Sequence, residues 1–295
     1  MRLGITTSHN KSVPALCLGA DIESLSKEPT LMRKILAALF GLCFSTTISA
    51  PALAHFQLIY TPEVNLDQAG EVPFKLIFWH PFENGYVMDM GQPEAFYYVH
   101  KGKKTDLLGA LKPMTFQGVS NKASAYETVV RLNRMGDYIF ALTPAPYYEG
   151  SEDIFIQQIA KSYVNRGGVP GDWNTPLGLP TEIVPLNKPT NVLAGSTFTG
   201  RLLSAGKPVS GGEVEVEFMA AEPDMERNTP KEPVASPMPG GSIVVMTDDD
   251  GYFTFGIPRA GFWGFAALGS GPVKEHKGKE LSQDAVLWIR AYDVE

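Results

Sequence analysis

The stretch Val72-Pro-Phe-Lys-Leu-Ile-Phe-Trp-His80 is the clearest indication of fold in this 295-residue sequence. Its even positions, from Val72 to Phe78, share one face because successive side chains of a strand point to opposite sides. His80 extends that face at the end of the run, and the proline after it stops strand pairing. The stretch therefore predicts a β-strand with one apolar face that ends in a histidine.

Similar short runs of alternating apolar residues recur between turn signals, and long amphipathic helical patterns are absent from the sequence. This pattern is typical of an all-β protein. We expect strands at 96–100, 126–132, 137–142, 196–203, 213–218, 243–246, 252–257, 263–268 and 285–290. Residues 153–164 fit either a strand or a helix.

The composition changes to Gly, Pro, Asn and Thr between residues 165 and 191. We predict a β-sandwich at 55–164, a packed linker at 165–191 and a second, smaller β-sandwich at 192–295. The second sandwich is expected to be immunoglobulin-like or transthyretin-like. In Glu213-Val-Glu-Val-Glu-Phe218 the apolar residues should face its core and the three glutamates should face water.

The segment before His55 has the features of an export signal. Met32-Arg-Lys precedes a short apolar run, and small residues then end in Ala52-Leu-Ala54, the pattern that signal peptidase cleaves. The apolar run is about half the roughly 20 residues that span a bilayer, so residues 32–54 predict a cleaved signal peptide and no membrane insertion of the mature chain. Residues 1–31 carry no periodic pattern, and we interpret them as the product of a misplaced start codon.

Cleavage after Ala54 would leave a periplasmic chain of 241 residues that begins at His55. Cys17 and Cys43 both lie in the removed part, so any metal must be held by His, carboxylate, Met or backbone groups. The formal net charge changes from −7 to −9, because five basic and three acidic residues are removed. Such an acidic chain has no electrostatic reason to bind nucleic acid or anionic lipid.

His55 is the residue that bears most on function. A terminal His55 would present a free α-amine and an imidazole on one residue, and the two together can chelate a divalent metal. Antiparallel pairing of the strand after His55 with the strand before His80 would bring the two histidines together, although the sequence leaves the register open. Glu83 offers an oxygen ligand, and Met88 or Met90 a thioether that suits Cu(I).

Simpler interpretations exist for each of these residues. His55 can be an arbitrary residue at a cleavage point, and the methionines can fill gaps in a core. His100 closes a solvated hairpin, and His276 lies in a charged loop. Asp248-Asp-Asp-Gly251 fits a tight turn better than a calcium loop, because the twelve-position pattern of oxygen ligands is missing. The sequence has no GxSxG, P-loop or dinucleotide motif.

Several blocks resemble exported bacterial proteins that are described as the periplasmic component of cobalt or nickel uptake systems, a family otherwise described as a domain of unknown function. The blocks are His55-Phe-Gln-Leu, Phe78-Trp-His-Pro-Phe-Glu83, Gly102-Lys-Lys-Thr-Asp-Leu107, Thr181-Glu-Ile-Val-Pro-Leu186 and Gly261-Phe-Trp-Gly-Phe-Ala-Ala-Leu268. The resemblance implies His55 and His80 as metal ligands, with Glu83 next. The sequence departs from those proteins at Gln157-Gln158, where some have a His. The second sandwich looks like the carboxypeptidase-regulatory-like domains, which usually act as spacers or docking modules.

The resulting hypothesis is a periplasmic metal-binding accessory protein, not an enzyme, that takes up nickel or cobalt and hands it to a membrane permease; copper is also possible as the metal. Two rival functions stay open. One is a copper monooxygenase acting on polysaccharides, which would use the same N-terminal histidine together with a second His. The other is a structural or glycan-binding protein in which His55 is incidental.

Overall fold

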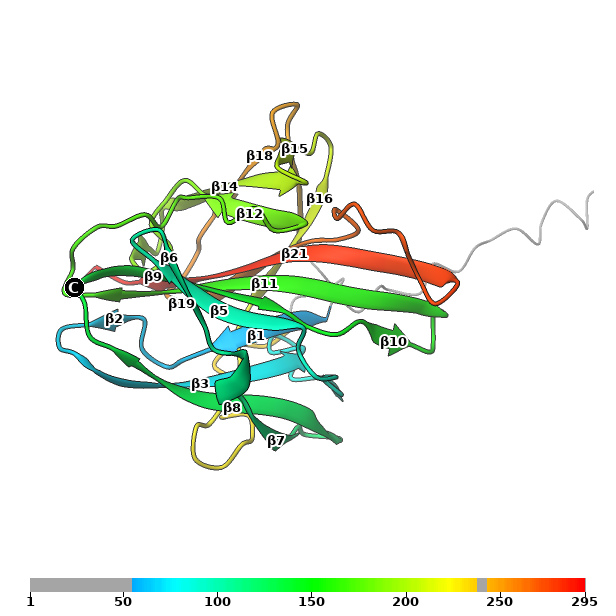
Figure 1. Ribbon diagram of the computed structural model, residues 1–295, viewed down its shortest axis with the longest axis horizontal. Coiled ribbons are helices and arrows are strands. Elements are labelled where there is room, and N and C mark those ends of the chain that lie inside the picture. Colours follow the sequence, from blue (N-terminus) through cyan, green and yellow to red (C-terminus); the bar gives the residue numbers. More distant parts are fainter. Residues whose placement is uncertain (1–54, 238–242, 295) are drawn as a thin grey trace, which may run out of the picture. The chain divides into compact units, whose positions relative to one another are not determined.

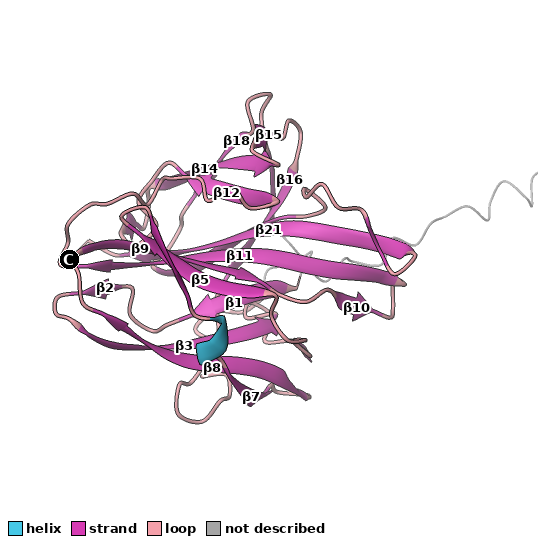
Figure 2. Ribbon diagram, in the orientation of Figure 1, coloured by secondary structure: helices cyan, strands magenta, loops and turns pink. Residues whose placement is uncertain are grey.

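The computed structural model describes residues 55–237 and 243–294. The predicted signal peptide at 32–54, the interpretation of residues 1–31 and both cysteines lie outside the described residues. The described chain is all-β, as the sequence predicts, and a 3₁₀ turn at Leu108–Ala110 is the one helical element within it (Figure 2).

The strands form three sheets (Figure 1). The five-stranded sheet contains β1 (Phe56–Tyr60), β3 (Gly70–Trp79), β4 (Val87–Met88), β7 (Lys112–Gln117) and β8 (Lys122–Leu132). The four-stranded sheet contains β12 (Thr181–Pro185), β14 (Thr197–Ser204), β15 (Lys207–Pro208) and β18 (Tyr252–Gly256). The twelve-stranded sheet contains β2 (Asn65–Leu66), β5 (Ala95–His100), β6 (Lys103–Asp106), β9 (Gly136–Thr143), β10 (Tyr147–Glu149), β11 (Ile154–Arg166), β13 (Val192–Leu193), β16 (Glu213–Phe218), β17 (Ile243–Met246), β19 (Gly261–Ala267), β20 (Glu275–His276) and β21 (Lys279–Tyr292).

The twelve-stranded sheet lies between the other two and contributes to a hydrophobic core on each face. Strand β21 shows the arrangement, because Val286 and Trp288 join the core under the five-stranded sheet while Leu287 and Ile289 join the core under the four-stranded sheet. Alternate residues of a strand point to opposite faces, so a central sheet needs apolar residues at both sets of positions. This explains the nearly continuous apolar run Ala285-Val-Leu-Trp-Ile289.

The chain has two hydrophobic cores, but the predicted linker at 165–191 does not separate the strands around them into two independent sheets. Strand β11 of the first half pairs in parallel with β21 of the second half over seven residue pairs, from Phe155–Leu281 to Lys161–Leu287 (Figure 1). The described residues accordingly lie in one compact unit. The predicted boundary at 165–191 is therefore not a boundary between separate bodies, because partners more than a hundred residues apart complete one sheet.

Segment 165–191 packs against the rest of the chain and supplies strand β12. Leu179 is buried, while Trp173 and Leu177 lie partly buried against the second core. Glu182 in β12 accepts hydrogen bonds from the backbone N–H groups of Leu177 and Gly178, at 3.0 and 2.8 Å. The same carboxylate lies 2.8 Å from Lys161 Nζ, so a buried ion pair ties the segment to β11.

The opening stretch forms β3, and its burial differs from the prediction in one respect. From Phe74 onwards both faces of the strand are buried, including Lys75 at 1% exposure. The ammonium of Lys75 lies 3.5 Å from Glu127 and contacts the side-chain oxygen of Asn228. These oxygens partly replace the water that a buried ammonium loses on folding.

Candidate metal-binding site

Strand pairing brings His55 and His80 face to face. Strands β1 and β3 pair antiparallel with Phe56 opposite Trp79. His55, which precedes β1, and His80, which follows β3, therefore lie at the same edge of this strand pair. The centroids of the two imidazole rings lie 4.8 Å apart, with the ring planes at 50°. The pairing left open by the sequence thus takes the register that joins the two predicted ligands.

A carboxylate lies beside each imidazole. Glu149 Oε2, at the end of β10, lies 3.9 Å from His55 Nε2. Glu217 Oε1, in β16, lies 3.8 Å from His80 Nδ1. A carboxylate next to one ring nitrogen orients the imidazole and raises the basicity of the other nitrogen, an arrangement common around metal-binding histidines.

Glu217 is the site residue that sequence reasoning missed. We expected Glu213, Glu215 and Glu217 to face water, but Glu215 and Glu217 are each only 4% exposed, and this expectation is wrong for both. The predicted alternation is confirmed, since Val214, Val216 and Phe218 face the second core. The opposite face of β16 is also covered, because the strand belongs to the central sheet.

The environment of Glu217 favours its neutral form. Burial raises the pKa of this carboxyl group, although the contact with His80 and the hydrogen bond from the Phe82 backbone N–H, at 2.7 Å, act in the opposite direction. The charge of Glu83 adds slightly to the increase in the pKa. A positive charge placed at His80 would therefore stabilise the ionised form of Glu217.

Glu149 behaves in the opposite way. Burial disfavours its charge, but hydrogen bonds from the Ser151 side chain and backbone, together with the charge of His55, lower its pKa overall. The two Ser151 contacts to Oε1 measure 2.6 and 3.0 Å. Glu149 is therefore an anion at neutral pH, and it counters positive charge at His55.

The remaining predicted ligands lie differently. Glu83 is exposed in the turn after His80. Met88 and Met90 are buried in the first core, where Met90 Sδ accepts a hydrogen bond from Gln57 Nε2 at 3.4 Å, so both methionines have ordinary packing roles. Gln158 accepts a hydrogen bond from the backbone N–H of Gln57 at 2.8 Å. Gln158 is one of the two glutamines at which some of the resembling proteins have a His, and it thus lies beside Gln57, two residues after His55.

His100 and His276 make contacts of other kinds. His100 stacks on Tyr138 with a centroid distance of 4.1 Å, and His276 meets Phe155 edge-on at 4.7 Å. Within residues 55–237 and 243–294, no group of three or more His, Cys, Asp or Glu side chains is arranged to hold a metal ion. The histidine pair would therefore need a ligand of another kind to complete a site.

These features define a class: all-β proteins in which two strand-end histidines meet between two carboxylates. The chain belongs to the family described as "Domain of unknown function (DUF4198)", whose model matches residues 52–271. The match includes the histidines of the first half and Glu217 of the second. No curated protein matches the sequence.

Several solved structures show distant similarity. The adhesin InvE of Yersinia pseudotuberculosis is 12% identical with a TM-score of 0.21, and the alignment covers 78% of this chain and 58% of the adhesin. A DUF4785 family protein of Legionella pneumophila is 11% identical with a TM-score of 0.26, covering 72% of this chain and 52% of that protein. The I67–I69 fragment of titin is 10% identical with a TM-score of 0.19, covering 83% and 66%. Similarity at these TM-scores carries no argument about function.

Among the described residues, no helix is long and apolar enough to cross a membrane.

Proposed function

We propose that this protein is a periplasmic accessory protein that binds a divalent transition metal, nickel or cobalt first, and passes it to a membrane transporter. The observation that carries the proposal is the meeting of His55 and His80, whose rings lie 4.8 Å apart at the ends of paired strands. Imidazole is a ligand that suits nickel and copper as well as zinc and iron.

The flanking carboxylates suggest which nitrogen atoms bind the metal. His55 Nε2 faces Glu149, so Nδ1 of the same ring would be the ligand, together with the α-amine that cleavage after Ala54 creates. His80 Nδ1 faces Glu217, so Nε2 of that ring would be the third nitrogen. In this proposal two residues supply three nitrogen ligands, and Glu149 and Glu217 balance the charge.

Ligand protonation would control release. Both imidazoles and the amine must be deprotonated to bind metal, and their ordinary pKa values are about 6.5 and about 7.7–8.0. We therefore expect metal to be lost below about pH 6. Nitrogen ligands favour copper over nickel and cobalt by the usual divalent order, so selectivity for nickel or cobalt would have to come from metal supply or site geometry.

The sharpest test changes only the α-amine. Two forms of the chain that begins at His55 are compared by calorimetry with Ni²⁺ and Co²⁺, one with a free α-amine and one with that amine acetylated. Acetylation keeps both imidazoles but converts the amine into an amide that does not bind metal, so we expect affinity to fall at least tenfold. Equal affinities would overturn the three-nitrogen site.

Side-chain variants complete the test. His55→Ala and His80→Ala should each abolish tight binding, whereas His276→Ala, which removes a histidine of a charged loop, should bind as the wild type does. Circular dichroism confirms that each variant is folded. Tight binding by the two site variants, or none by the wild type, would contradict the proposal and leave a structural or glycan-binding role.

The copper monooxygenase hypothesis gains from the same observation, because it requires a second histidine beside the first. Copper bound to the mature chain would supply the redox chemistry, while His55 and His80 would hold the ion. The two functions differ in turnover: a monooxygenase oxidises polysaccharide with oxygen or peroxide, and an accessory protein only exchanges its metal. Assays of the copper-loaded protein on polysaccharide distinguish the two functions.

A further inference from the structure

A basic pocket that shares no residue with the candidate metal-binding site opens between the β5–β6 hairpin and the connection from β8 to β9. Its volume is about 430 Å³, within the range of roughly 300–1,000 Å³ typical of small-molecule sites. Four cationic side chains line it, namely Lys101, Lys103, Arg131 and Arg134. We refer to this site as the basic pocket.

The charge of the basic pocket contrasts with that of the chain. None of its lining residues is acidic, although the whole sequence carries a formal charge of −7. The carboxylate of Asp172 accepts hydrogen bonds from the backbone N–H groups of Lys101 and Gly102, at 3.3 and 2.9 Å. Asp172 thus holds the hairpin turn and is not one of the lining residues.

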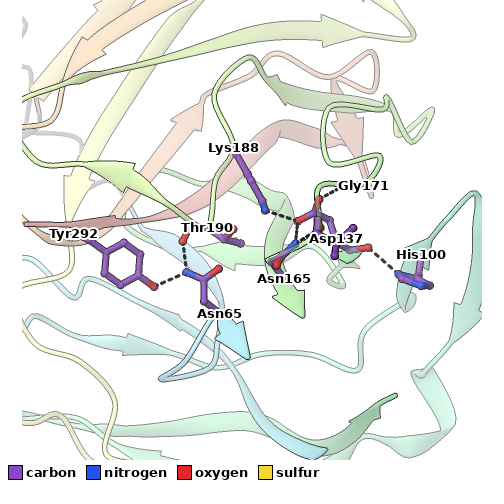
Figure 3. Close-up of polar contacts among 9 residues, drawn as sticks. Asn65, His100, Asp137, Asn165, Gly171, Lys188, Thr190 and Tyr292 are labelled. Carbon is purple, nitrogen blue, oxygen red and sulfur yellow. Dashed lines mark hydrogen bonds and ion pairs between the residues drawn. The ribbon is translucent and has the colours of Figure 1, made fainter. Parts of the chain in front are cut away.

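The wall of the basic pocket includes a buried histidine. His100 is 7% exposed and stacks on Tyr138, and its Nδ1 lies 2.9 Å from the backbone oxygen of Asp137. A carbonyl oxygen only accepts, so Nδ1 donates this hydrogen bond (Figure 3). Nε2 is covered and has no hydrogen-bond partner among the described residues. Buried polar atoms without a partner are rare in proteins, and an ordered water or ion often accounts for them.

The scaffold behind His100 is rigidly held. The buried Asp137 side chain accepts hydrogen bonds from Asn165 Nδ2 and from the Gly171 backbone N–H, both at 2.6 Å, and lies 3.5 Å from Lys188 Nζ (Figure 3). Gly136 has a φ of 119°, and a Cβ there would lie 3.3 Å from His100 Cε1. Only glycine adopts this φ readily, so Gly136 leaves room for the imidazole.

Hydrogen bonds hold the Arg131 side chain and the Arg134 backbone at the rim of the basic pocket. Arg131 Nε donates to Asn133 Oδ1 at 3.2 Å, and the Tyr138 hydroxyl donates to the Arg134 carbonyl at 2.8 Å while accepting from the Arg134 N–H at 3.0 Å. Cations gathered in a concave site repel one another unless an anion lies between them, and a cleft lined by one sign of charge concentrates ligands of the opposite sign.

We propose that the basic pocket binds a small soluble oxyanion with at least two negative charges, carried by phosphate or carboxylate groups. Arg131 and Arg134 hold the oxyanion through charge-assisted hydrogen bonds, and the two lysines neutralise the rest of its charge. His100 and Tyr138 form part of the wall between these cations. The concave shape favours a small ligand over a membrane surface.

Calorimetry of the mature chain at low ionic strength tests this proposal with pyrophosphate and citrate as soluble probes and phosphatidylglycerol vesicles as the membrane probe. We expect saturable binding of at least one soluble anion. Arg131→Gln/Arg134→Gln should weaken binding about a hundredfold, because each lost charged hydrogen bond costs about tenfold.

The matched control is Lys207→Gln/Arg227→Gln, which removes the same formal charge from exposed residues outside the basic pocket. This control should bind the soluble anion as the wild type does. Equal loss of affinity in both double variants, no saturable binding of either soluble probe, or binding of the vesicles alone would overturn the proposal. Unchanged Ni²⁺ binding by the pocket variants shows that they are folded and that the two sites are separate.

Discussion

The buried pair of Lys161 and Glu182 allows a quantitative test of how the two halves are joined. The two side chains are 1% and 2% exposed, and Nζ lies 2.8 Å from Oε2. Glu182→Gln removes the negative charge and puts an amide N–H₂ in place of one acceptor oxygen. The ammonium of Lys161 would then lie in the interior without a counter-charge, a change that typically costs about 3–5 kcal/mol.

The cost has an upper limit, because Lys161 can lose its proton. Burial lowers the pKa of Lys161, and the charge of Glu182 and its hydrogen bond with Lys161 act against this effect. In the unfolded chain the ordinary value is 10.5, so deprotonation at 1.36 kcal/mol per pH unit costs about 4.8 kcal/mol at pH 7 and about 2.0 kcal/mol at pH 9. In the Glu182→Gln variant the unfolded state then binds more protons than the folded state. The free energy of unfolding of this variant therefore rises with pH.

The assay is urea unfolding at pH 7 and pH 9, followed by tryptophan fluorescence. We expect Glu182→Gln to lose about 3–5 kcal/mol at pH 7 and clearly less at pH 9. Lys161→Met/Glu182→Gln should recover at least half of the loss. Lys279→Met, which breaks the exposed pair with Asp153, should change stability little because water screens that pair. A loss no larger than in that control, or the same loss at both pH values, would refute the reasoning.

Three further measurements test the fold and the site. Urea unfolding of the wild type, followed by tryptophan fluorescence and by circular dichroism, should give coincident transitions because the two cores share a sheet; two separate midpoints would contradict this. Gly264→Ala should cost about 1–3 kcal/mol, since its Cβ would lie 2.8 Å from the Trp288 ring, whereas an alanine in place of Gly256, with open space around it, should cost little. Burial raises the pKa of Glu217, so wild-type stability should fall as pH rises from 4.5 through that raised pKa, and urea titrations of Glu217→Gln should lack this decrease.

Local patterns were sufficient to predict most strands. The predicted run at 213–218 coincides with β16, and 243–246 coincides with β17. Residues 153–164 proved to be strand β11, which pairs with neighbours on both sides. Such a strand is apolar on both faces, and this removes the period-2 alternation that distinguishes a strand from a helix.

Two features depend on contacts that no local pattern contains. The pairing of β11 with β21 joins residues 126 positions apart, such as Gln158 and Asp284, so the shared sheet was not predictable. The burial of Glu217 follows from that sheet. Alternation in β16 separates its residues into two faces, but it does not say that both faces are covered.

The shared sheet also has a consequence for the candidate metal-binding site. His55 and His80 come from the first half of the chain, whereas Glu217, next to His80, comes from the second. Strand β16 reaches His80 only because β19 and β21 connect it to β11 within one sheet. The second half is therefore more than a spacer in this structure: it supplies the buried acid that sets the electrostatics of His80. A metal ion at the histidine pair would favour the ionised form of Glu217, so the proposed metal binding would be coupled to the charge state of the second half.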